Sequence, residues 1–261
     1  MATINIPSSD DTRAYRNDPT RNYGTEAETS IWTYNGTQYQ VSFAKFAGIS
    51  GIGSPNIPPN STINSAILWM RIRADSTSLT VSVYTCSTDW NESTLIWNNM
   101  PGQVTSIGSF ANMPANTGGW LSLDITSTVR GWNNGTIPNY GLRLVTDQGG
   151  SNSGAFATKE SANVPYIAVN YVTPANITAT GMTVTPNENP CRTGICTLSV
   201  SVTWTNDGGS IGSFTPSITV SSGTVTPIYS SEQLAAGSPT THSFTVSNMT
   251  IGSCSICPNP N

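Results

Sequence analysis

The chain has 261 residues, enough for two domains of ordinary size that each bury a core. Only 9% of the residues are charged, against about a quarter in an average soluble domain, whereas 36% are hydrophobic. A disordered polar chain is therefore excluded. The net charge of −4 and the presence of just two lysines argue against a nucleic-acid partner, because such binding needs clustered basic residues.

The sequence shows no membrane or export segment. No apolar run reaches the roughly 18–20 residues that cross a bilayer. The first residues lack the basic and apolar regions of a signal peptide. We therefore expect either an exported protein whose signal was removed, at the cell surface or in the extracellular space, or a protein of a virion surface.

Apolar and polar residues alternate along most of the chain, and helical periodicity is nearly absent. The alternation is visible at 67–73, 79–84 and 167–171, and it is most regular at 198–204. Clusters of Gly, Pro and Asn separate such segments, for example at 51–59 and 149–154. Many short strands joined by such turns predict an all-β protein built from sandwiches or jelly rolls.

A hairpin is expected over residues 31–41, with its turn at Asn35-Gly36. Side chains two positions apart share one face of a strand, so Trp32 and Tyr34 should lie together. With Tyr39 they could form an aromatic platform that binds a sugar ring, or they could cover the core of the sandwich.

One short helix is expected after Asp124 or Thr126, either of which could cap it. Val129 and Trp132 are three positions apart and would share one face of this helix. We expect it to close one end of the sandwich.

A domain boundary is expected near Thr173-Pro174, which gives domains at 1–172 and 173–261. The strand that ends at residues 171–172 closes the first domain. Charged residues are rare from residue 174 onward. The net charge of each domain is small, so neither domain would attract a partner through its overall charge.

Residues 8–172 resemble the DNRLRE-type domain in five segments that occur in the same order: 43–46, 63–70, 90–101, 120–132 and 165–171. The resemblance implies a jelly-roll β-sandwich related to a family of carbohydrate-binding modules. It also implies that Trp90 and Trp97 pack in the fold and that Glu92 bonds backbone amides. Asp89 and Glu92 are then structural and not a catalytic pair, and Glu160 is a hydrogen-bonding hub.

Residues 174–257 resemble immunoglobulin-like adhesion domains of the CARDB type in the segments 200–209, 234–237 and 244–246. The resemblance implies a smaller immunoglobulin-like β-sandwich that serves as a spacer or an adhesive repeat.

Acidic residues near the start of the chain, Asp10, Asp11 and Asp18, could supply oxygen ligands to a structural calcium ion. They show no spaced ligand motif, and solvated loop carboxylates are the alternative. No other cofactor is expected.

The five cysteines fall into two groups. Cys86 stands alone in an apolar strand and is expected to be a buried thiol. Cys191 and Cys196, together with Cys254 and Cys257, are candidates for two disulfides, although four cysteines allow three connectivities. A zinc site made of the same four thiolates is the rival interpretation.

Three sequons, at Asn35, Asn60 and Asn134, fall in expected turns where a glycan could fit. His242 is the sole histidine and is expected to be exposed on a strand. No catalytic constellation can be assembled around it, so the chain is expected not to be an enzyme.

Two functions remain open at this point. The first is a non-catalytic structural or adhesive protein of an extracellular filament, a surface layer or a virion surface. It would self-associate or bind an assembly partner, and residues 1–7 could complete a neighbour's sheet. The alternative is a carbohydrate-binding module that recognises a polysaccharide of a cell surface or matrix.

Overall fold

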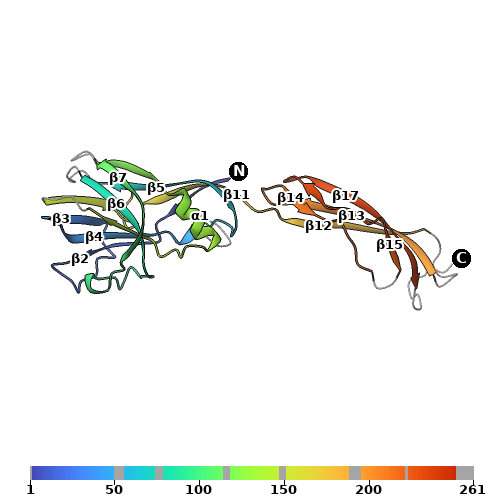
Figure 1. The fold of residues 1–261 in the computed structure, drawn as a ribbon, viewed down its shortest axis with the longest axis horizontal. Coiled ribbons are helices and arrows are strands. Elements are labelled where there is room, and N and C mark those ends of the chain that lie inside the picture. The colour runs from blue at the N-terminus through green and yellow to red at the C-terminus, as the bar shows by residue number, and fades with distance from the viewer. Residues whose placement is uncertain are drawn as a thin grey trace. The chain divides into compact units, whose positions relative to one another are not determined.

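The computed structural model describes residues 2–49, 56–73, 79–113, 118–146, 151–187, 195–220 and 223–250. The chain divides into two compact units, Met1–Val172 and Thr173–Asn261 (Figure 1). Strands dominate both units, which confirms the all-β expectation. The described part of the chain has no helix with the length and hydropathy that a bilayer crossing requires.

The first unit contains an eleven-stranded antiparallel sheet. Its strands are β1 (Ala2–Pro7), β2 (Asp10–Tyr15), β3 (Glu28–Tyr34), β4 (Thr37–Lys45), β5 (Thr62–Ile72), β6 (Leu79–Cys86), β7 (Gln103–Met113), β8 (Gly119–Asp124), β9 (Leu142–Val145), β10 (Ser151–Ala157) and β11 (Tyr166–Val172). Two short 3-10 helices, Ala47–Ile49 and Trp97–Asn99, and the helix α1 (Thr126–Asn134) lie between them.

The sheet runs in the order β1-β11-β5-β10-β3-β4-β9-β6-β7, with β2 beside β4 and β8 beside β5. Strand β10 joins two layers: Phe156 pairs with Thr29 of β3 and also with Ile72 of β5. The main core contains buried side chains of β5 and β11 together with those of β3, β6 and β9. The sheet therefore folds over at β10 into a sandwich that encloses one core.

Local sequence signals explain the hairpin and the helix. Asn35 and Gly36 both have positive φ, 49° and 74°, as a tight two-residue turn requires. Helix α1 buries Val129 and Trp132 on one face, as expected. Gly135, with φ 76°, adopts the left-handed conformation that ends many helices.

The connection 87–102 covers part of the outer face of the sheet. Its Trp90 and Leu95 form a second buried cluster with Phe43, Val41 and neighbouring residues. The Trp90 and Phe43 rings meet edge-on with centroids 5.7 Å apart, and Trp90 Nε1 donates to the Tyr140 carbonyl at 2.8 Å. The C-terminal half of β4 is consequently buried on both faces.

The N-terminal strand lies in the sheet of its own unit. All six residues of β1 pair with β11, and Ile6 is buried in the main core. The expectation that residues 1–7 are available to complete a neighbour's sheet is therefore wrong for this structure, because the edge of β11 already binds them.

The second unit contains a four-stranded sheet and a two-stranded sheet. The order of the first is β12-β13-β17-β15 and the second pairs β14 with β16. The bounds are β12 (Ile177–Pro186), β13 (Ile195–Asn206), β14 (Gly212–Phe214), β15 (Thr224–Thr226), β16 (Glu232–Leu234) and β17 (Pro239–Thr250). The strongest alternation of the sequence lies in β13, where Val200, Val202 and Trp204 face the core of this unit.

We expect Phe156→Ala to lower the free energy of unfolding of the first unit by about 3–5 kcal/mol, because it empties a fully buried site where the layers join. Chemical denaturation followed by tryptophan fluorescence measures this change. The control is Ser151→Ala, an exposed position on the same strand, where the change should stay within about 0.5 kcal/mol. Equal effects of the two substitutions would contradict the role given to Phe156.

Candidate functional site

An aromatic cluster lies on the outer face of the sheet formed by β2, β3 and β4. Ile31 and Thr33 of β3 point into the core, so Trp32 between them points outward. Its ring lies 4.7 Å from the ring of Tyr39 on β4 and 6.4 Å from that of Tyr15 on β2, measured between centroids. All three side chains are partly exposed, so their rings form an open apolar patch.

Tyr34 lies beyond this cluster, at the tip of the hairpin. It shares the outward face with Trp32, as expected, and is 49% exposed. Within the described residues, however, the rings that pack against Trp32 are those of Tyr39 and Tyr15. The sequence analysis did not identify Tyr15 as part of this cluster. Tyr15 of β2 lies near Trp32 only because both residues pair with Gln40 of β4.

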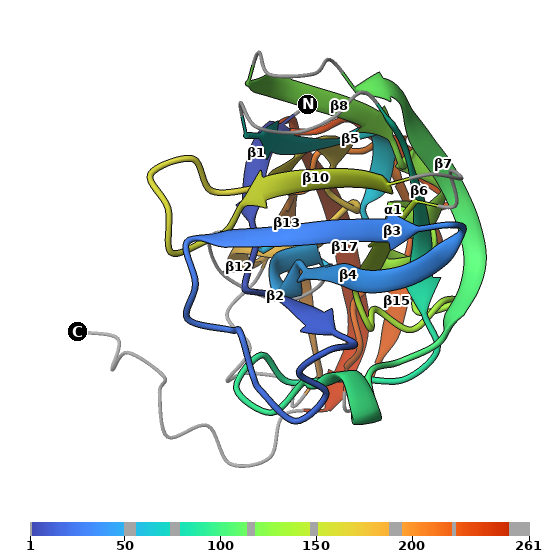
Figure 2. The ribbon, with the colours of Figure 1, turned by 90° about the vertical axis from the view of Figure 1, so that its left-hand side faces the viewer.

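A polar hollow of about 250 Å³ adjoins the aromatic cluster. Four strands contribute to its lining, and the ribbons of these strands lie side by side in Figure 2. The lining side chains are Arg13 of β2, Glu28 and Ser30 of β3, Gln40 of β4, and Ser153 and Ala155 of β10. Gln40 and Ser153 both pair with Trp32 across the strands, so the hollow begins where the rings end.

The charges of the hollow are compensated by nearby side chains. Arg13 lies 2.6 Å from a carboxylate oxygen of Glu26, and Glu28 lies 2.7 Å from the guanidinium of Arg73. Ser30 Oγ donates to Gln40 Oε1 at 2.5 Å. The hollow thus offers hydroxyl and amide groups without a strong net charge, next to apolar ring faces. This combination suits a polyhydroxylated ligand.

A second aromatic group lies on the other layer, and the sequence analysis did not identify it. Trp69 of β5 and Tyr166 of β11 are cross-strand partners with nearly parallel rings, at 17° and 6.2 Å between centroids. Trp120 of β8 meets Tyr166 at 5.4 Å and is 38% exposed. The register that aligns β11, β5 and β8 brings them together, and no short segment of sequence shows that register.

Three carboxylates converge on the side of the unit where β2 begins. One ligand oxygen each from Asp11, Glu92 and Glu160 lies within 4.8 Å of the others. The ammonium of Lys159 lies 2.7 Å from Glu92 Oε2 and 2.6 Å from Glu160 Oε1. Burial is the main cause that raises the pKa of Asp11 to about 6.

Of the three aspartates expected near a calcium ion, only Asp11 belongs to this group. Asp10 accepts a hydrogen bond from Ser9 Oγ instead, and Asp18 faces the hydroxyl of Tyr23. Adjacent residues of a strand point to opposite faces, which separates Asp10 from Asp11.

The interpretation of Asp89 and Glu92 as structural residues agrees with their contacts. Asp89 pairs with Lys45 at 2.6 Å, and this pairing holds the pKa of the Asp89 carboxyl below its usual value. Glu92 Oε1 accepts the backbone N–H of Asp11 at 2.9 Å, as the family resemblance implied.

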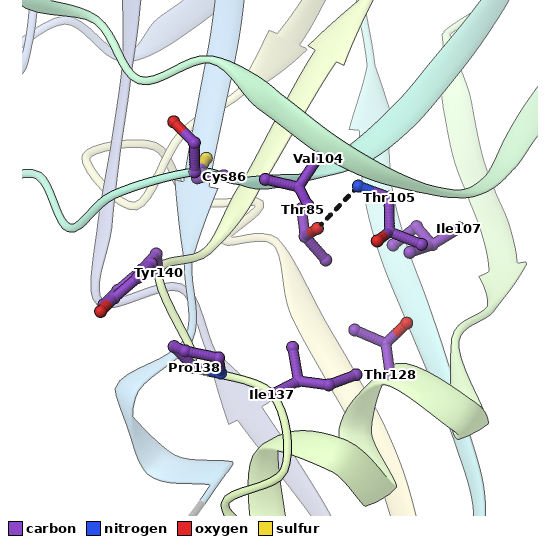
Figure 3. A pocket seen from close by; sticks show the side chains of 10 residues that line it. Thr85, Cys86, Val104, Thr105, Ile107, Thr128, Ile137, Pro138 and Tyr140 are labelled. Atoms are coloured by element: carbon purple, nitrogen blue, oxygen red, sulfur yellow. Dashed lines mark hydrogen bonds between the residues drawn. The ribbon is translucent and has the colours of Figure 1, made fainter.

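An apolar pocket of about 230 Å³ lies between the paired strands β6 and β7 and the segment that follows α1 (Figure 3). Ile137 and Thr128 face Thr85 and Thr105 across it. None of its lining residues is charged. It therefore offers little to a strongly polar ligand.

His242 is not exposed, contrary to expectation. Its ring packs against Tyr229 at 4.5 Å and Trp204 at 5.7 Å, and its Nε2 contacts Glu232 Oε1. These contacts with Tyr229 and with Glu232 of β16 leave the side chain of His242 only partly exposed.

The three candidate sequons are exposed, but one of them is not in a turn. Asn35 and Asn60 occupy turns with positive φ. Asn134 is the last residue of α1, and its Oδ1 accepts from the N–H and the hydroxyl of Thr136, the third residue of its own sequon. The expectation of a turn at Asn134 is wrong, because α1 continues through Asn134 and the turn begins at Gly135.

A family model described as Carbohydrate-binding module family 96 matches residues 2–171. The chain is also 27% identical over 195 residues to the tRNA nuclease WapA of Bacillus subtilis (strain 168), and 25% identical over 189 residues to the tRNA3(Ser)-specific nuclease WapA of Bacillus spizizenii. These matches cover 68% and 66% of the chain but only 8% of each relative.

The cysteines are described only in part. Cys86 is buried, and this burial raises the pKa of its thiol to about 12. Cys196 lies in β13, whereas Cys191, Cys254 and Cys257 fall outside the described residues. The two expected disulfides therefore stay a prediction.

Thiol titration at pH 8 tests both statements about the cysteines. With a pKa near 12, only about one Cys86 in ten thousand is a thiolate at this pH, so the folded protein should not react with Ellman's reagent. Unfolding in guanidinium without reductant should release one thiol if the other four cysteines form disulfides. Five released thiols would contradict the disulfides and favour the zinc alternative.

Proposed function

The chain belongs to carbohydrate-binding module family 96, and from this premise we propose that it is a non-catalytic module that binds polysaccharide outside the cell or at a cell surface. The nuclease activity named for its relatives is not part of the proposal. The matched segment makes up only 8% of those proteins, so their activity can reside elsewhere in them.

The observation that carries this proposal is the aromatic cluster of Tyr15, Trp32 and Tyr39 beside the polar hollow. Aromatic faces supply apolar contact area at a low cost in conformational entropy, and hydroxyl and amide groups then orient the ligand. We assign the contact with the apolar face of a sugar ring to Trp32 and Tyr39. Gln40, Ser30 and Ser153 are the assigned hydrogen-bonding groups.

The shape of the face favours a chain over a single sugar. Glu28, Ser30, Trp32 and Tyr34 follow one another along the outward side of β3, which extends over about 20 Å. Because Arg13 and Glu28 are already paired with Glu26 and Arg73, the proposed ligand is a neutral polysaccharide.

We expect Trp32→Ala to weaken binding of a neutral polysaccharide at least about tenfold, because it removes the central ring of the cluster. Calorimetry on a panel of neutral glucans, xylans and mannans, together with one polymer of uronic acids, measures the affinity. The matched control is Trp120→Ala, which removes an exposed tryptophan from the other layer.

Far-UV circular dichroism of both variants verifies the fold. If Trp120→Ala lost binding and Trp32→Ala did not, the polysaccharide would bind at the face of Trp69, Trp120 and Tyr166 instead. Binding of the uronate polymer alone would overturn the assignment of a neutral ligand, and no binding by the wild type to any polymer would overturn the proposed function.

We also propose that the second unit contributes self-association, the structural and adhesive part of the expected function. Met182 and Val184 of β12 are 69% and 46% exposed, although their cross-strand partners Val202 and Val200 lie in the core. Within the described residues β12 pairs along one edge only. An apolar strip beside an open strand edge suits pairing with a second copy of the chain. Assembly into a filament, a surface layer or a virion would require further contacts.

We expect Met182→Lys to suppress concentration-dependent self-association, because it places a charge in this strip. Sedimentation velocity over a hundredfold range of concentration measures the effect. Thr183→Lys adds the same charge at the next residue, on the opposite face of β12, and should suppress self-association less. A wild type that stays monomeric throughout, or equal effects of the two lysines, would contradict this part of the proposal.

A further inference from the structure

The cluster of Asp11, Glu92 and Glu160 is assembled from three distant parts of the chain. Asp11 lies at the start of β2, Glu92 in the connection between β6 and β7, and Glu160 in the connection between β10 and β11. One oxygen of each carboxylate lies within 4.8 Å of the others. Like charges repel at this distance, so the fold maintains the arrangement against an electrostatic cost unless cations compensate it.

Asp11 contains a buried oxygen that receives no hydrogen bond from the described residues. The residue is 2% exposed. Its Oδ2 accepts hydrogen bonds from Ser8 Oγ at 2.6 Å and from the backbone N–H of Lys159 at 2.9 Å. Its Oδ1 is buried and has no hydrogen-bond partner in the described part of the chain. Buried carboxylate oxygens are almost always hydrogen-bonded or bound to a cation, so Oδ1 lacks a ligand.

Within the described residues, a single cation contacts this cluster. Lys159 is the ammonium in contact with it, at 2.7 Å from Glu92 and 2.6 Å from Glu160. Its side chain is 29% exposed at the edge of the site. Lys45, the other lysine, is engaged with Asp89. Three carboxylates thus face one ammonium.

We propose that Asp11, Glu92 and Glu160 form a binding site for a hard divalent cation of the calcium class. The donors are all carboxylate oxygens, the ligands that calcium prefers, and no histidine or cysteine belongs to the group. The cation binds Asp11 Oδ1 and one oxygen each of Glu92 and Glu160, and water completes its coordination. Lys159 moves its ammonium into solvent when the cation enters.

The surroundings hold the ligands in place before the cation binds. Asn22 Nδ2 donates to the carbonyl of Glu92 at 2.6 Å and to that of Leu95 at 2.9 Å. Gly24 approaches Glu92 so closely that a Cβ there would lie 2.5 Å from Glu92 Cγ. A cation in this site would therefore join β2 to the connections 87–102 and 158–165 and stabilise the first unit. The inference concerns stability and does not depend on the proposed ligand.

Thermal unfolding of the full chain, treated with EDTA and then dialysed, tests the site. We expect saturating CaCl₂, about a hundredfold above Kd, to raise Tm by about 5 °C or more, and calorimetry to detect one site. A response to MgCl₂ as well would support a broader divalent site. Asp11→Asn and Glu160→Gln should each weaken calcium binding at least about tenfold. Asp10→Asn removes the same charge from the neighbouring residue outside the cluster and should leave calcium binding unchanged.

The variant Lys159→Met distinguishes a cation-binding site from a cluster in which Lys159 is the permanent partner of the carboxylates. It keeps the apolar stem but removes the competing ammonium, so the variant should be less stable in EDTA and regain stability in CaCl₂. If calcium and magnesium change neither the wild type nor Lys159→Met, the proposal is overturned and Lys159 is the permanent cation of the cluster. Equal responses of the wild type and Glu160→Gln would also overturn it, because the cation then binds elsewhere.

Discussion

Trp90 lies edge-on against Phe43 and donates its indole N–H to Tyr140, and this contact determines which part of the outer face remains open. The buried Leu95, the side chain of Asn22 and the Lys45–Asp89 ion pair also hold the connection 87–102 that carries Trp90. Anchored there, it buries the C-terminal half of β4 on both faces. The N-terminal half of β4, its neighbour β3 and the next strand, β10, are left uncovered. The aromatic cluster and the polar hollow occupy this uncovered part.

Local signals predicted much of the first unit. Alternation identified β5, β6, β11 and, in the second unit, β13, because a half-buried strand repeats every two residues. Asn35-Gly36 identified the hairpin, and Val129 with Trp132 identified α1. The folding of one sheet into two layers at Phe156 has no such signal, since it depends on pairings between strands that are distant in sequence.

The candidate sites show the same limit. Trp32 and Tyr34 were placed on one face by spacing alone, but the packing partner of Trp32 is Tyr39, because a bulge shifts the register of β3 against β4. Asp11 and Glu92 are 81 residues apart, and their contact follows from the anchoring of the connection 87–102. The position of His242 at the start of a predicted strand indicated an exposed side chain, whereas Tyr229 and Glu232 contact its ring.

The two proposed sites of the first unit share their strands. Arg13 lines the hollow and lies two residues along β2 from Asp11, and Ala155 lines it four residues before Lys159 on the continuation of β10. Both strands run from the hollow directly into the carboxylate cluster. A cation that fixes the ends of β2 and β10 would therefore restrict the floor of the hollow as well. Polysaccharide affinity would then depend on the concentration of calcium around the protein, which differs greatly between the inside and the outside of a cell, and the module would bind where calcium is abundant.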